Sequence, residues 1–221
     1  MSNLNVIIFI LSSLILASCI TAPLTTPKSA RSLGKEKWSV DLSLEPFLSF
    51  SAATGLTDDL DLGLLIENFI PTTLGLWTRY SIINSKDGFS LGAFGGGFLT
   101  IYPSDSSIIS DGSNTLKGFY VGPIISYRGR VFEPHFSVRY NYVNIGNGII
   151  NKDNSSTKEM REALDIDDNN SYSYLQFTLG ANFWVKKDLA LTLDGKVFSS
   201  KNLSKFKLTY ILPGFGILMT F

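Results

Sequence analysis

The chain has 221 residues, enough for one domain of moderate size, and its 19 basic side chains balance its 19 acidic ones. Balanced charge provides no basic surface for nucleic acid, so nucleic acid is not expected as a partner. The single cysteine excludes an internal disulfide and a multi-thiolate metal centre, the single histidine excludes a histidine-rich cluster, and no metal or other cofactor is predicted.

The N-terminus begins with an apolar run, LNVIIFILSSLILA, over residues 4–17. This run has the length of a signal-peptide core and is too short for a comfortable transmembrane helix. It ends in Leu16-Ala17-Ser18-Cys19, which resembles the lipobox of bacterial lipoproteins at all four positions. The resemblance implies that residues 1–18 are removed and that Cys19 is acylated. An ordinary secretory signal with an incidental cysteine is the alternative.

The residues after the cysteine have no apolar period. Ile20 follows it instead of aspartate, which by the same resemblance implies transport to the outer membrane. Proline, threonine, serine and lysine dominate as far as residue 37. We therefore predict a lipidated N-terminus and flexible tether over residues 19–36, followed by one domain over residues 37–221.

From Trp38 onward the dominant period is two, with apolar residues alternating with polar ones, as in strands with one apolar face. Short turns alternate with longer connections, which predicts an all-β, up-and-down antiparallel barrel. The strands are expected near 37–44, 47–54, 59–66, 73–83, 88–102, 117–128, 131–145, 171–185, 188–199 and 207–221.

The strand count depends on whether the chain turns at Glu45-Pro46, because the alternation keeps its phase through this dipeptide. A turn there gives ten strands, whereas one strand over 37–54 gives an odd number. Single-chain bacterial barrels have even numbers. We therefore predict ten strands, with eight as the alternative.

Alternation alone does not say which face contacts water. A soluble lipocalin-like barrel would turn the apolar positions inward around an apolar ligand, whereas a membrane barrel would turn them outward to lipid. Lys117, at a strand end, is the one charged residue among the apolar positions, and charge is costly on a lipid face. Aromatic residues gather beside the short turns, as in an interfacial girdle. We predict the outward arrangement, that is, an all-β, up-and-down antiparallel transmembrane β-barrel.

The C-terminal stretch GFGILMTF resembles the C-terminal signature of bacterial outer-membrane barrels, which the insertion machinery reads. Gly216, Met219 and Phe221 carry the match, whereas Gly214 replaces the usual polar residue. The resemblance implies an outer-membrane protein whose partners are membrane lipid and the insertion machinery. Both termini are expected in the periplasm, and a monomer is expected.

Charged and polar side chains on the inward positions are expected to form a network that compensates charge inside a narrow lumen. Its predicted members are Arg79, Glu133, His135, Arg139, Asp194 and Lys196. A Glu133–His135 pair close to Ser137 also suggests a barrel hydrolase, which we keep as a third hypothesis.

Together these patterns predict a small outer-membrane lipoprotein barrel with a structural or surface-binding role and no large pore. It is not expected to be an enzyme. The alternatives are a lipid-anchored, lipocalin-like barrel that binds an apolar ligand and a hydrolase that uses His135. The sequence does not identify an extracellular ligand.

Overall fold

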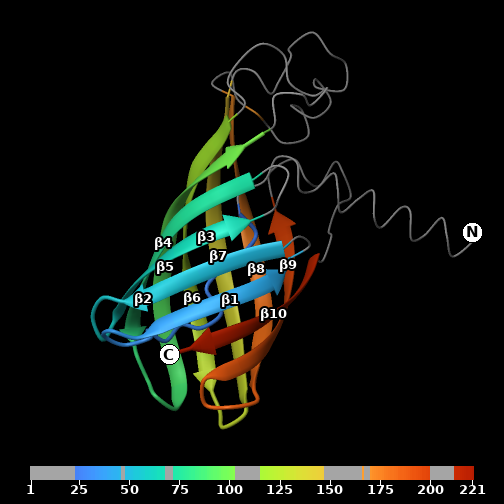
Figure 1. The fold of residues 1–221 in the computed structure, drawn as a ribbon. Helices are drawn as coiled ribbons and strands as arrows, with labels where there is room; N and C mark the ends of the chain where they lie inside the picture. Colours follow the sequence, from blue (N-terminus) through green and yellow to red (C-terminus); the bar gives the residue numbers. More distant parts are fainter. Residues whose placement is uncertain are drawn as a thin grey trace, which may run out of the picture.

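The computed structural model describes residues 23–45, 48–67, 72–102, 115–146, 166, 170–199 and 212–221. Within these ranges the chain forms ten strands (Figure 1). They are β1 (Trp38–Leu44), β2 (Leu48–Gly55), β3 (Leu60–Glu67), β4 (Thr72–Ile83), β5 (Gly88–Ile101), β6 (Thr115–Arg128), β7 (Phe132–Ile145), β8 (Ser171–Trp184), β9 (Leu189–Ser199) and β10 (Leu212–Thr220).

The strands form one closed antiparallel barrel in chain order, in which β1 pairs with β10. The predicted ten-stranded barrel is confirmed, and the eight-stranded alternative is wrong. The chain does turn after β1, because Leu44 pairs with Leu48 of β2. The last strand is described from Leu212 rather than from residue 207, since residues 207–211 lie outside the described ranges. Among the described residues, no helix is long and apolar enough to cross a bilayer.

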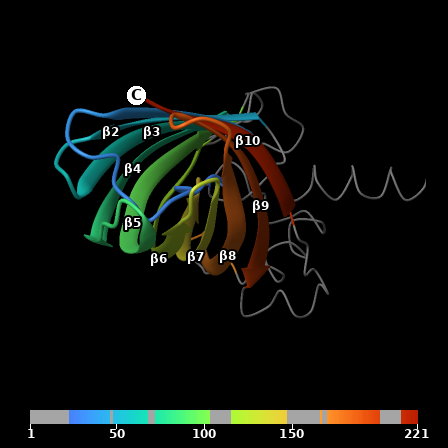
Figure 2. The same cartoon turned by 90° about the horizontal axis from the view of Figure 1, so that it is seen from below.

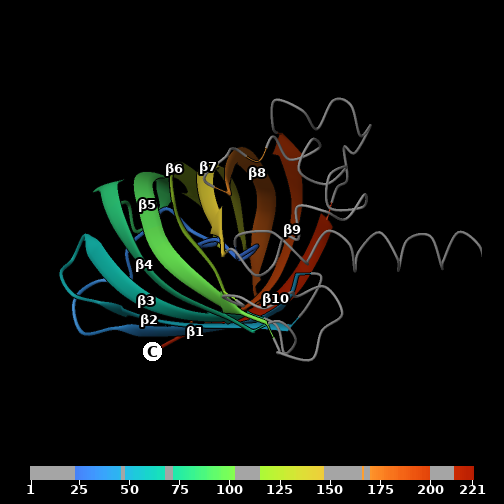
Figure 3. The ribbon, with the colours of Figure 1, turned by 90° about the horizontal axis from the view of Figure 1, so that it is seen from above.

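The two ends of the barrel differ. Tight turns join strands at one end: Leu56 and Thr57 donate backbone hydrogen bonds to Leu60 O, and Val185 and Lys186 donate to Leu189 O. The C-terminal Phe221 lies at this end, where it exchanges backbone hydrogen bonds with Trp38. We call it the short-turn end and the opposite one the long-loop end. Viewed along its axis, the barrel is flattened on the side of β1, β2 and β10 (Figures 2 and 3).

The strands alternate as the sequence predicts, with apolar side chains outward. Leu64 and Leu76 pair across β3 and β4 and are 58% and 56% exposed. The inward residues of the same two strands include Asp61 and Arg79, which are buried. The outer surface is therefore a belt of leucine, isoleucine, valine and phenylalanine, and the lumen contains the ionic groups. A lipocalin-like barrel would have the reverse arrangement, so the structure gives it no support.

Exposed aromatic side chains ring the outer surface beside the short turns. Members of this ring are Trp38, Tyr80, Phe89, Tyr127, Phe132, Phe183 and Phe221. Amphipathic rings favour the headgroup level of a bilayer, because one part is apolar and the other tolerates water. The predicted girdle is thus in place on the outer surface.

Part of the lumen is apolar, which the alternation did not predict. Buried aromatic and aliphatic side chains from β5 to β8 form a cluster that includes Phe98, Leu116, Tyr120, Val143 and Tyr174. These large side chains fill that side of the lumen, whereas the flattened side has small inward residues such as Ser43, Ser49 and Ser51. The polar space therefore lies off centre, toward β1, β2 and β10.

A charge on the outer belt is expected to destabilise the barrel. Leu64→Lys should cost about 2–4 kcal/mol, because a lysine at mid-membrane depth must reach water past hydrocarbon. Denaturant unfolding of protein folded in lipid vesicles measures this cost. Leu56→Lys is the matched control, since Leu56 is equally apolar but lies in a turn outside the belt. Equal stability of the two variants would contradict a lipid-facing Leu64.

Candidate functional site: the lumen and the segment inside it

The segment before β1 lies inside the barrel. Residues 23–30 are all buried, and residues 31–34 are partly buried. The two end-on views show this part of the chain, in blue, within the ring of strands (Figures 2 and 3). The prediction of a flexible tether over residues 19–36 is therefore wrong for residues 23–34. We call these residues the lumen segment.

The lower end of the lumen segment turns at the short-turn end of the barrel. Gly34 has a φ of 88°, a left-handed conformation that glycine adopts without strain. It lies against Gly55, where an added Cβ would come within 1.9 Å of Gly34 O. A side chain at position 55 would thus displace the turn. Glu36 N donates to Gly55 O, which joins the turn to the end of β2.

Above this turn, an ion pair on the wall holds the lumen segment. Arg79 of β4 donates through Nε and Nη2 to Asp61 Oδ2 of β3, at 2.8 and 2.6 Å. The other oxygen of Asp61 accepts from Ser32 Oγ and Leu33 N. Arg79 Nη1 donates to Ser29 O at 2.7 Å. A single buried pair therefore binds both the wall and three residues of the lumen segment.

The middle of the lumen segment contacts β4 again and two further strands, β6 and β7. Ser81 Oγ of β4 donates to Ala30 O, and Ala30 N donates to Ser126 Oγ of β6. Ser29 Oγ donates to Glu133 Oε1 of β7 at 2.6 Å. Backbone groups of the segment thus find partners on the wall, as buried backbone groups require.

Lys28 lies among three carboxylates. Its Nζ is 2.8 Å from Glu45, 3.3 Å from Asp41 and 3.8 Å from Asp194. Lys196 also pairs with Glu45 and Asp194. Asn182 Nδ2 donates to Lys28 O at 2.7 Å. Each of these charged side chains is buried, so the cluster exists only because two cations and three carboxylates compensate one another.

The upper end of the lumen segment bridges the lumen. Glu67, the last residue of β3, accepts hydrogen bonds from Leu24 N, Thr25 N and Thr25 Oγ1. Gln176 Nε2 of β8 donates to Leu24 O at 3.0 Å. In the ring, β3 and β8 are five strands apart in either direction, so they stand opposite each other. One peptide unit and two side chains therefore cross the whole lumen at this level.

Arg139 of β7 is buried without a carboxylate partner among the described residues. Its Nη1 donates to Thr25 O at 3.0 Å, and its Nη2 donates to Gln176 Oε1 and to Pro23 O. The guanidinium carbon lies 4.6 Å from the centre of the Tyr120 ring. Carbonyl oxygens of the lumen segment and an aromatic face thus accommodate this charge.

The six residues of the predicted network all face the lumen, but they do not form one network. Arg79 pairs with Asp61, Glu133 pairs with Arg128 and Arg31, and Asp194 pairs with Lys196 and Lys28. Arg139 joins the lumen segment as described above. Neither ring nitrogen of His135 has a hydrogen-bond partner in the described part of the chain.

The contacts of His135 bear on the hydrolase hypothesis. A hydrolytic site needs the base bonded to its nucleophile and to an orienting group. Glu133 instead accepts from Ser29 and from Trp184 Nε1, and the Ser137 hydroxyl has no hydrogen-bond partner among the residues that the structure describes. The His135–Glu133–Ser137 arrangement thus lacks the contacts of an activated nucleophile. In the same ranges no group of three metal-ligating side chains is placed to hold a metal.

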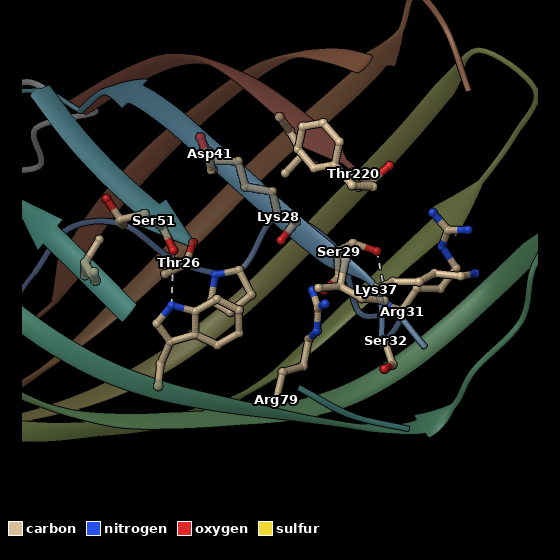
Figure 4. A pocket seen from close by; sticks show the side chains of 18 of the residues that line it. Thr26, Lys28, Ser29, Arg31, Ser32, Lys37, Asp41, Ser51, Arg79 and Thr220 are labelled. Atoms are coloured by element: carbon tan, nitrogen blue, oxygen red, sulfur yellow. Dashed lines mark hydrogen bonds and ion pairs between the residues drawn. The ribbon is translucent and has the colours of Figure 1, made fainter. Parts of the chain in front are cut away.

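A cavity of about 240 Å³ lies between the lumen segment and the wall, toward the short-turn end (Figure 4). Its lining includes Lys28, Arg31, Asp41, Ser51, Arg79 and Thr220. Arg31 and Lys28 belong to the segment, and Arg79 is already paired with Asp61. The cavity is therefore space that the docked segment leaves open between itself and the wall.

The C-terminal residues of the predicted signature occupy the closing strand. Gly216 pairs with Ser43, and Met219 pairs with Val40. A Cβ on Gly216 would lie 2.4 Å from Ser43 Oγ, so glycine is required where β10 passes that serine. Phe221 is exposed in the aromatic ring. Cys19 and residues 1–18 lie outside the described residues, so acylation and signal cleavage remain predictions.

No family model and no curated protein matches the sequence. Among solved structures, the chain is similar to the N-terminal β-barrel domain of Pseudomonas aeruginosa OprF, with 15% identity and a TM-score of 0.35 over 85% of this chain and 99% of that one. It is similar to Ail of Yersinia pestis, with 12% identity and a TM-score of 0.36 over 84% of this chain and 97% of that one. It is also similar to the KdgM porin in complex with disordered oligogalacturonate, with 7% identity and a TM-score of 0.40 over 84% of this chain and 99% of that one.

Sequence reasoning missed the residues that dock the lumen segment. Glu45 and Glu67 end or follow strands, where the sequence pattern predicts connections, and Lys28 falls in the predicted tether. The charge balance of the wall could have indicated these residues. Buried carboxylates of the wall outnumber its cations, so a positive group from outside the strands is needed to compensate them. Among the described residues, the six buried wall carboxylates are Asp41, Glu45, Asp61, Glu67, Glu133 and Asp194, against the buried Arg79, Arg139 and Lys196 and the partly buried Arg128.

The docked segment should resist trypsin. Lys28 and Arg31 are followed by peptide bonds that the wall covers, so these bonds are expected to survive digestion of the folded protein in lipid vesicles. Lys35, whose side chain is 67% exposed, is an internal control that should be cut. Mass spectrometry of the fragments distinguishes the sites. Rapid cleavage after Lys28 in folded protein would contradict docking.

Proposed function

We propose that this protein is an outer-membrane β-barrel lipoprotein that stays closed to large solutes and acts through the surface at its long-loop end. The observation that carries the proposal is the outward apolar belt with its aromatic ring, around a lumen crossed by residues 23–34. Such an outer surface is stable in lipid, and such a lumen has no open path for a sugar or peptide. The short-turn end with Phe221 then faces the periplasm.

The lipoprotein part of the proposal rests on Cys19 and the residues before it. Acylation adds membrane affinity for each buried methylene, but a membrane-spanning barrel does not need that anchor to stay inserted. The monomeric state and recognition by the insertion machinery through Gly216, Met219 and Phe221 are parts of the same proposal. The predicted periplasmic position of the N-terminus does not fit this orientation, because the described chain reaches the long-loop end at Leu24 and four residues span at most about 14 Å. We also propose a non-enzymatic role, because His135 and Glu133 do not contact each other through hydrogen bonds.

Removing the acyl anchor separates a membrane barrel from a lipid-anchored soluble one. Cys19→Ala protein is expected to remain with membranes after carbonate washing and to shift on gels between unboiled and boiled samples, as wild type does. A soluble barrel would be released. Mass spectrometry of wild type should show an acylated Cys19 as the first residue. An unmodified Cys19 in the mature chain would refute the lipoprotein part and leave the barrel part standing.

A further inference from the structure

The lumen segment follows a route from one end of the barrel to the other. It starts at the Gly34–Gly55 contact at the short-turn end, and it reaches Glu67 at the last residue of β3, at the long-loop end. Between these points it passes the small wall residues Ser81 and Ser126. A chain that connects both ends fills a continuous passage. An extended chain occupies a cross-section of roughly 5 by 10 Å, which is wide enough for a partly hydrated monovalent cation.

The wall along this route is negatively charged. Among the described residues, its six buried carboxylates face three buried cations and the partly buried Arg128, which leaves an excess of two carboxylates, and His135 adds no formal charge when neutral. Some of these carboxylates form ion pairs within the wall, which do not depend on the segment. Asp61 pairs with Arg79, and Glu133 pairs with Arg128. Lys196 is the wall cation that pairs with both Glu45 and Asp194. Among the described residues, Glu67 has no cation within salt-bridge distance, and Asp41 has none once Lys28 is gone. An emptied passage would therefore attract cations.

The segment supplies the compensating positive charge itself. Lys28 contacts Asp41, Glu45 and Asp194, and Arg31 contacts Glu133. Its backbone amides at Leu24 and Thr25 satisfy Glu67. Each carboxylate that the wall leaves uncompensated thus meets a donor from residues 23–31. The segment behaves as a bound cationic peptide in a site built for positive charge.

We propose that the lumen is a passage selective for small monovalent cations and that residues 23–34 close it. In the docked state, Lys28 occupies the position where a permeating cation would be held by Asp41, Glu45 and Asp194. The cavity beside Lys28 extends toward the short-turn end, where Lys37, Arg128 and Lys187 also line it, and cations would enter the vacated route past these side chains. The apolar cluster of β5 to β8 narrows the rest of the lumen, so larger solutes stay excluded.

Planar-bilayer recordings in a potassium chloride gradient test the proposal with full-length protein. Lys28→Glu puts a fourth carboxylate among three and should undock the segment. We expect wild type to be closed and Lys28→Glu to show steady channels that pass potassium several-fold better than chloride. Lys35→Glu is the matched control, because it makes the same charge change on an exposed side chain outside the lumen and should stay closed.

A disulfide lock links the current to the segment. Ser29 Oγ and Ser126 Oγ lie 3.5 Å apart, so cysteines at both positions can join the segment to β6. In Cys19→Ser/Lys28→Glu protein, Ser29→Cys/Ser126→Cys should close the channel when oxidised and reopen it when reduced. Ser29→Cys alone should not respond to oxidation.

Deletion of residues 24–33 makes the test decisive even if Lys28→Glu fails to fold. The deleted protein, shown to be folded by heat-modifiable gel mobility, should conduct cations. A folded deletion protein that is closed or anion-selective would overturn the proposal. A cation current that is unchanged when the Ser29→Cys/Ser126→Cys disulfide is oxidised would show that the segment is not the closing element.

Discussion

Arg79→Met is expected to lower the free energy of unfolding by about 3–5 kcal/mol, the usual cost of leaving one partner of a buried ion pair without the other. Asp61 is fully buried, and Arg79 is the one cation within salt-bridge distance of it in the described structure. Denaturant unfolding in lipid vesicles, followed by gel mobility, measures the loss. Arg79 also binds Ser29 O, so the variant loosens the lumen segment as well.

The double variant Asp61→Leu/Arg79→Met provides the control for this prediction. Removing both charges takes away the uncompensated carboxylate, so much of the lost stability should return. The return is incomplete, because Ser32 Oγ and Leu33 N lose their acceptor. A loss below about 1 kcal/mol for the single variant would place the pair in the class of exposed salt bridges and contradict its burial.

Lys28→Met is the second large prediction, and it should act on docking rather than on the barrel. The variant leaves Asp41, Glu45 and Asp194 with Lys196 as their one remaining cation in the described part of the lumen. A cost of about 3–5 kcal/mol shifts the docking equilibrium by roughly two to four orders of magnitude. Because the segment can leave and water can enter, the strands themselves should remain folded.

Trypsin cleavage after Arg31 reports the released segment in this experiment. The cleavage rate should rise strongly in Lys28→Met and only weakly in Lys28→Arg, which keeps the charge. Lys35→Met is a surface control with no effect expected at Arg31. An unchanged rate in Lys28→Met protein that still shows heat-modifiable mobility would contradict the electrostatic account of docking.

The alternation of the strands was enough to predict the barrel, because burial on a strand repeats every second residue. Leu62, Leu64 and Ile66 lie on one face of β3, and this pattern is the same whichever side chains fill the lumen. The turn after Leu44 was harder, since the phase continues across it. Even parity of bacterial barrels, rather than any local signal, decided that strand count.

The docked segment could not be predicted from the same pattern. Residues 23–34 are held mainly by backbone groups and by single side chains such as Lys28, so no period marks them. Their composition is that of a linker, because small and polar residues suit both a linker and a narrow polar lumen. The sequence contains each lumen carboxylate, but it does not show which residue forms an ion pair or hydrogen bond with that carboxylate. That partner depends on which strands stand opposite each other in the closed ring.

The order of assembly follows from where the lumen segment finds its partners. Residues 23–34 leave the ribosome before any strand, yet they contact β3, β7, β8 and β9 across up to 164 positions of sequence. Contacts of such long range form late. The first described residues to be synthesised are thus expected to be among the last to reach their place, so a ring that has just closed should pass through a hollow stage before residues 23–34 fill it.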